Sequence, residues 1–193
     1  MLQFLYDRST KRNTLIAFIA TVFIMIFMNG ISTAFYNSTG GYGILDMAGG
    51  ANLTDSRSPI LSESETNDLL QHYGEKGIRF HKRILIGDLV LPTSLTISFC
   101  FLIGLLYKIR TNEISAPKTM YIPMTYLALD TLENLVICKI LFSYPESAGN
   151  LTLPLNLLRT AKFAASGVMV VASIFYFLKL LNEKTRRKRT VNP

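Results

Sequence analysis

The sequence is poor in the side chains on which most metal sites and disulfide frameworks depend. Its 193 residues contain no tryptophan, two cysteines and two histidines. Cys100 and Cys138 lie in apolar segments without a CxxC or metal-ligand spacing, so they are interpreted as small buried hydrophobic residues. His72 and His81 lack a third ligand at a typical spacing. We therefore expect neither a metal nor a cofactor.

Charged side chains are also scarce, and this scarcity indicates a membrane protein. Asp, Glu, Lys and Arg make up 17% of the chain, hydrophobic residues make up 49%, and the mean hydropathy is +0.30. Crossing a hydrocarbon core about 30 Å thick takes roughly 20 mostly apolar helical residues. Four such runs predict an all-α polytopic fold, a four-transmembrane-helix bundle in a single membrane domain, residues 1–193. The predicted spans are about 13–36, 84–107, 120–144 and 155–181. A proline at position 92 predicts a kink in the second span.

The distribution of lysine and arginine sets the predicted orientation. The N-terminal segment, the connector between the second and third spans, and the tail 182–193 are all basic. Four spans place these three segments on one side, which the positive-inside rule identifies as cytoplasmic. We expect a multi-pass protein of the cell membrane, with both termini cytoplasmic and an outer loop at 37–83. A cleaved signal peptide is the rival interpretation of the first run, because a basic segment precedes it and residues 32–34 offer small side chains at a possible cleavage point.

The basic balance of the chain does not indicate nucleic-acid binding. The net charge is +7 and the isoelectric point is about 9.5, but the excess lies mostly in the segments that flank the spans. Such residues favour anionic lipid headgroups, at about 1 kcal/mol each. Membrane lipids are the expected partners and nucleic acid is not, while a protein partner or a second copy of the chain stays open.

The outer loop contains one recognisable helix signal. Ser62 and Glu65 match a capping box and predict a short helix over 63–73, which Gly74 ends. A second, amphipathic helix over 75–83 is expected to lead into the second span. Three glycosylation sequons also lie on the predicted outer side, and they matter only in a chain that enters a secretory pathway. They begin at Asn37, Asn52 and Asn150.

The third span carries the most informative polar residues. Asp130, Glu133 and Asn134 stand at i, i+3 and i+4 and share one helix face, which Ile137 and Leu141 continue. An ionised carboxylate at mid-membrane costs about 2.5–3.5 kcal/mol, so this face should point into the bundle. The acids then require paired cations, raised pKa values, hydrogen bonds or a water-filled cavity.

Cations for this face are available in the fourth span. Arg159 and Lys162 lie at a similar depth, whereas Lys139 should reach the outer interface and act as an anchor. The candidate intramembrane polar cluster consists of Asp88, Asp130, Glu133, Asn134, Arg159 and Lys162. It has two interpretations. It is an interhelical network that fixes packing, or its acids carry protons, bind a cation or hold a polar headgroup.

Three short motifs resemble those of small four-span membrane proteins of bacteria. They are YGILD after the first span, a helix with Gly-Glu-x-Gly that leads into a span beginning Gly-Asp, and DTLEN in the third span. The resemblance implies the same topology and supplies no activity.

Three function classes follow from the sequence. The first is a non-enzymatic integral membrane protein whose cluster stabilises the bundle. The second is a proton- or cation-coupled transporter or channel component that uses Asp130 and Glu133; an internal repeat of the spans would favour it, and none is found. The third is a membrane enzyme acting on a lipid, with an acid as general base and Lys162 or Arg159 holding a phosphate. The sequence lacks the His cluster or Ser-His pairing typical of such enzymes.

Overall fold

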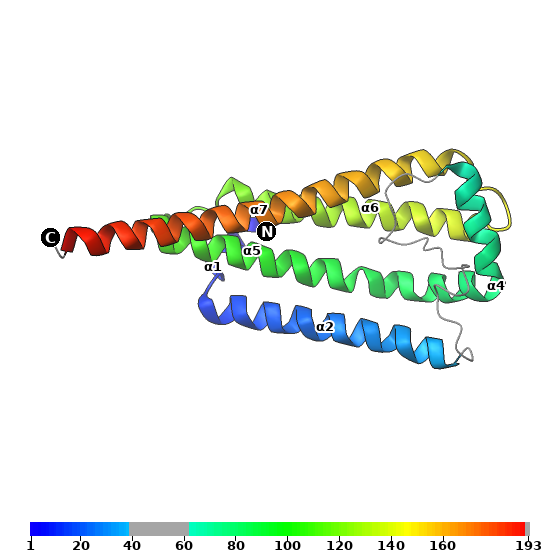
Figure 1. Ribbon diagram of the computed structural model, residues 1–193, viewed down its shortest axis with the longest axis horizontal. Helices are drawn as coiled ribbons and strands as arrows, with labels where there is room; N and C mark the ends of the chain where they lie inside the picture. Colours follow the sequence, from blue (N-terminus) through cyan, green and yellow to red (C-terminus); the bar gives the residue numbers. More distant parts are fainter. Residues whose placement is uncertain (39–61, 192–193) are drawn as a thin grey trace. The chain divides into compact units, whose positions relative to one another are not determined.

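The computed structural model describes residues 1–38 and 62–191. Within them the secondary structure is helical without strands, which confirms the all-α prediction. The YGILD motif and the sequon at Asn52 lie outside the described residues. The helices are α1 (Leu2–Asp7), α2 (Lys11–Ser38), α4 (Glu63–Asp88), α5 (Val90–Thr111), α6 (Tyr121–Ser143) and α7 (Thr152–Val191), with 3₁₀ turns η1 (Lys118–Met120) and η2 (Gly149–Leu151) (Figure 1).

Three helical segments in the described part of the chain are long and apolar enough to cross a membrane. They are Lys11–Met28, Val90–Thr111 and Gly149–Asn182. They correspond to three of the four predicted spans, and they are compatible with a membrane protein. Helix α6 covers the remaining predicted span, but it is not among these three segments. Crossing by α6 therefore stays a prediction.

The apolar helix α5 begins later than the second span that the sequence predicts. Residues 84–88 belong to α4, and the helix is interrupted at Leu89 before α5 begins at Val90. Pro92 explains this break, because a proline lacks an N–H and its ring clashes with the carbonyl four residues earlier, here that of Asp88. The interruption lies upstream of the proline, so the kink expected inside a span from residue 84 becomes a boundary between two helices.

The N-terminal half of α4 begins with the predicted capping box. The Glu65 backbone N–H donates to Ser62 Oγ at 3.2 Å, and the Ser62 N–H donates to Glu65 Oε2 at 2.7 Å. The helix changes direction at Gly74, where φ is 57° and ψ is −179°. Because residues with a side chain rarely adopt this backbone conformation, a glycine suits the position. The helix start and the break match the sequence prediction, while a place in an outer loop stays a prediction.

The contacts of the chain group it into two compact units. Unit 1 consists of Met1–Thr21, Thr93–Leu127 and Ala164–Pro193. Unit 2 consists of Val22–Pro92 and Ala128–Phe163.

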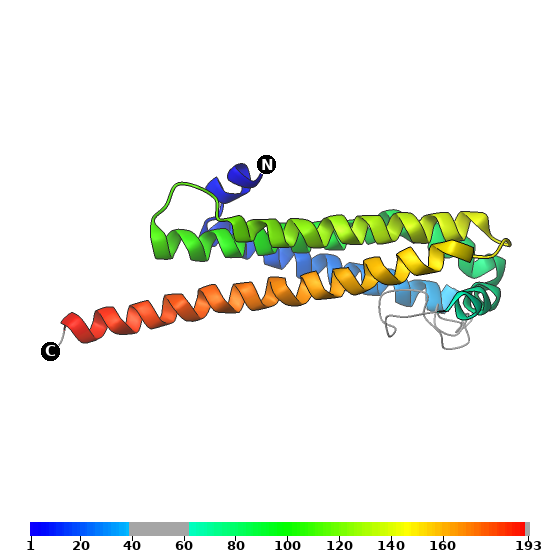
Figure 2. The ribbon, with the colours of Figure 1, turned by 90° about the horizontal axis from the view of Figure 1, so that it is seen from above.

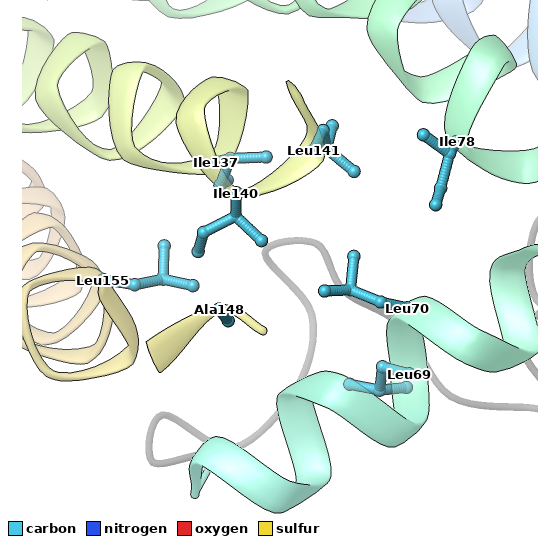
Figure 3. Close-up of a cluster of buried hydrophobic side chains, with 8 residues drawn as sticks. All are labelled: Leu69, Leu70, Ile78, Ile137, Ile140, Leu141, Ala148 and Leu155. Atoms are coloured by element: carbon cyan, nitrogen blue, oxygen red, sulfur yellow. The ribbon is translucent and has the colours of Figure 1, made fainter. Parts of the chain in front are cut away.

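Unit 2 has an apolar core that joins α4, α6 and the start of α7. Leu70 and Ile78 of α4 and Leu141 of α6 are buried in it, as Figure 3 shows. The connector between α6 and α7 is held to α4 by hydrogen bonds: Asn67 Oδ1 accepts from the Ala148 N–H at 2.9 Å. Ile137 and Leu141, which lie on the same face of α6 as its acids, are both buried in this core, as the sequence predicted.

Unit 1 has a separate core in which aromatic rings meet edge to face. The Tyr107 ring lies 6.3 Å from that of Tyr6 and 6.0 Å from that of Tyr176, measured between centroids. Cys100 is buried in the same core, in agreement with its interpretation as a small hydrophobic residue. Burial, reinforced by the nearby carboxylates of Glu113 and Asp7, raises the pKa of Tyr6. Its hydroxyl stays protonated and donates to the Glu113 carbonyl at 2.7 Å.

Candidate buried ion-pair cluster

The polar residues of α6 meet the cations of α7 within unit 2. A short connector that includes η2 joins the two helices, and next to it the end of α6 and the start of α7 run antiparallel (Figures 1 and 2). Asp130 and Glu133 are one turn apart on α6, and Arg159 and Lys162 are one turn apart on α7. These four side chains and Asn134 form the ion-pair cluster.

The contacts of the cluster form a continuous network. Arg159 Nε donates to Glu133 Oε1 at 3.0 Å. Lys162 Nζ lies 2.6 Å from Glu133 Oε2 and 3.3 Å from Asp130 Oδ1, so it bridges the two carboxylates. Asn134 Nδ2 donates to Asp130 Oδ2 at 3.2 Å. Each of the four carboxylate oxygens therefore has a partner.

The cluster is electrically balanced and almost fully enclosed. Two carboxylates face two cations, and the exposed fractions are 4% for Asp130, 1% for Glu133, 0% for Arg159 and 4% for Lys162. Opposite charges at hydrogen-bond distance offset part of the large cost of removing each ion from water. The structure confirms a buried cluster of acids and lysine between helices.

The pairing follows from the antiparallel register of the two helices. Moving three residues forward on α6, from Asp130 to Glu133, matches moving three residues back on α7, from Lys162 to Arg159. Both pairs thus stand at i and i+3, the spacing that keeps side chains on one helix face. A one-residue shift between α6 and α7 would rotate a carboxylate away from its cation, so the cluster favours one register.

Five of the six residues proposed from the sequence come together in this way. The sixth, Asp88, is the last residue of α4, and its side chain lies outside the described part of the structure. Lys139 is exposed, which agrees with its predicted separation from the cluster. The signal that sequence reasoning left unused is the matched i, i+3 spacing of acids and bases on two helices joined by a short connector.

The geometry limits what the cluster can do chemically. Lys162 already occupies the position between the two carboxylates that a bound cation would take, and Arg159 directs its Nε at the carboxylate of Glu133. Among residues 1–38 and 62–191, no group of three His, Cys, Asp or Glu side chains is placed to hold a metal ion. The arrangement is that of an internal network which binds α6 to α7.

Comparison with known proteins adds no relative to this picture. Neither a family model, nor a curated protein, nor a solved structure matches the chain.

Proposed function

We propose that the chain is a non-enzymatic integral membrane protein of the cell membrane in which α2, α5, α6 and α7 each cross the bilayer. In this proposal the ion-pair cluster fixes α6 against α7 inside the membrane. The observation that carries it is the pairing of two buried carboxylates with two buried cations, because each carboxylate oxygen already has a partner on the protein.

The length and surface of α6 support a fourth crossing. Its 23 residues, at about 1.5 Å each, reach the roughly 30 Å of a hydrocarbon core. Its acids point inward, whereas Leu132, Leu135 and Phe142 are 48%, 61% and 66% exposed. A helix embedded in lipid requires an apolar face toward the lipid and polar residues, with their charges balanced, only on the face toward its neighbours.

The distribution of basic residues also supports four crossings. With α6 in the membrane, the basic N-terminal segment, the connector after α5 and the tail all lie on one side. With three crossings, the tail would lie opposite the N-terminal segment, in conflict with the positive-inside rule. Both termini are therefore proposed to be cytoplasmic.

The substitution Asp130→Asn separates this function from transport. It removes one charge but leaves Lys162 paired with Glu133, so we expect the free energy of unfolding to fall by about 1.5–3 kcal/mol, the range for hydrogen bonds to charged groups. The measurement is SDS titration of purified protein in mixed micelles. The matched control is Lys139→Gln, which changes an exposed charge on the same helix and should leave stability unchanged.

The same two variants are reconstituted into vesicles for a flux assay. A structural cluster gives no pH-dependent proton or cation flux in the original chain or in either variant. If the original chain carries such a flux and Asp130→Asn abolishes it without lowering stability, the cluster is a transport site and our proposal is wrong.

A further inference from the structure

The first residues of unit 1 form the short helix α1, which packs against the unit 1 core on one face and exposes apolar side chains on the other. Within α1, Leu2, Leu5 and Tyr6 pack against the unit 1 core. The other face of the same short helix exposes 52% of Phe4, and Met1 before it is 78% exposed. A six-residue helix is too short to be stable alone, so its contacts with the rest of unit 1 hold it in place.

The connector that follows α5 is fastened to α1 and adds a further exposed apolar residue. Gln3 Nε2 donates to the Ile114 carbonyl at 2.9 Å, and Gln3 Oε1 accepts from the Ala116 N–H at 3.0 Å. At the end of α1, Lys108 Nζ donates to the Asp7 carbonyl at 3.0 Å. Figure 2 shows α1 beside this connector. The side chain of Ile114 is 88% exposed. We call α1 and residues 112–117 the α1 platform.

The segments that form and flank the platform are rich in basic residues. Residues 1–12 and 108–118 contain six Lys or Arg residues and two acidic residues. The Arg8 guanidinium lies 3.9 Å from the centroid of the Phe4 ring. An arginine stacked on an exposed aromatic ring offers an apolar body and a charged end at one place, as residues at a membrane surface do.

We propose that the α1 platform rests in the headgroup layer of an anionic phospholipid leaflet, with Phe4 and Ile114 inserted at the edge of the acyl chains. The apolar residues supply the insertion and the surrounding cations supply the preference for negatively charged lipid. A soluble acidic protein would also pair with the cations. A membrane surface accounts in addition for the exposed apolar residues, because they lie beside the first candidate span, which begins at Lys11. The inference rests on the proposed membrane location of the chain.

The absence of tryptophan from the sequence makes this proposal directly measurable. Phe4→Trp and Ile114→Trp each introduce a single tryptophan at an exposed position, whose emission is excited selectively over that of the nine tyrosines. The variants are reconstituted into phosphatidylcholine vesicles with and without phosphatidylglycerol, and quenching is measured with lipids brominated near the headgroup end of their acyl chains. We expect blue-shifted emission and quenching by brominated lipid for both probes, and stronger quenching when phosphatidylglycerol is present.

Two reference probes distinguish the possible failures. Ile19→Trp lies on α2 at a position 59% exposed and should be quenched by any bilayer that surrounds the helix. Glu146→Trp is exposed between α6 and α7 and should emit as a residue in water. If Ile19→Trp is quenched while Phe4→Trp and Ile114→Trp emit like Glu146→Trp, the platform proposal fails and the membrane location stands. If Ile19→Trp is also not quenched, both fail. Equal quenching of the platform probes in the two vesicles would contradict the assignment of an anionic surface.

Discussion

Replacing Lys162 with methionine lowers the free energy of unfolding by about 3–5 kcal/mol, the range for breaking a buried ion pair by removing one partner. Methionine keeps much of the volume of the lysine stem but removes the charge that bridges Glu133 and Asp130 at 2.6 and 3.3 Å. Two buried carboxylates then face the single cation of Arg159. SDS titration in mixed micelles measures the loss.

The control for this substitution is Lys139→Met on α6. It makes the same chemical change at an exposed position, and we expect the free energy of unfolding to stay within about 0.5 kcal/mol of the original chain. A loss for Lys162→Met no larger than that of the control would show that the lysine is not required by the two acids.

Substituting Gly104 with alanine destabilises unit 1 by about 1–3 kcal/mol, the usual cost of overpacking a closed contact. A Cβ at this position in α5 would lie 2.4 Å from Ser9 Oγ and 3.0 Å from Ser9 Cβ. Ser9 is buried at the corner between α1 and α2, and its hydroxyl donates to the Leu5 carbonyl at 2.9 Å. Moving it away would disturb that hydrogen bond as well. Thermal unfolding in detergent measures the effect.

The matched control is Gly167→Ala in α7. A Cβ there would meet nothing within 4 Å, so the substitution should be neutral or should stabilise the helix by up to about 1 kcal/mol. Adding Ser9→Ala to Gly104→Ala removes the hydroxyl nearest the new methyl group and should recover part of the loss. Equal effects of the two glycine substitutions would contradict the close approach of α5 to Ser9.

The sequence was informative where one physical effect dominates. Long apolar runs predicted four helices that the structure also has, because the membrane length requirement leaves few alternatives, and three of them are long and apolar enough to cross a membrane. The capping box at Ser62 and Glu65 and the stop at Gly74 were readable because each depends on residues within a few positions. The inward orientation of the acids on α6 followed from the cost of exposing a carboxylate to lipid.

Features that depend on contacts between distant residues were not readable to the same degree. The sequence grouped Lys162 with the acids Asp88, Asp130 and Glu133 without assigning its partner, and only the register of α6 against α7 places it between Glu133 and Asp130. The effect of Pro92 was placed inside a span, although its clash acts on the carbonyl four residues earlier. The attachment of α1 to the connector after α5 depends on Gln3, a residue without any distinguishing pattern.

The most direct test of the pairing between α6 and α7 is a double-mutant cycle on Glu133 and Arg159. Glu133→Leu removes the carboxylate that Arg159 contacts, and Arg159→Met leaves two buried carboxylates facing the single cation of Lys162. The double variant retains the contact between Asp130 and Lys162 at 3.3 Å. We expect each single variant to lose several kcal/mol and the double variant to recover most of that loss, because replacing a whole buried pair with apolar residues is often neutral. Losses that simply add in the double variant would contradict the account.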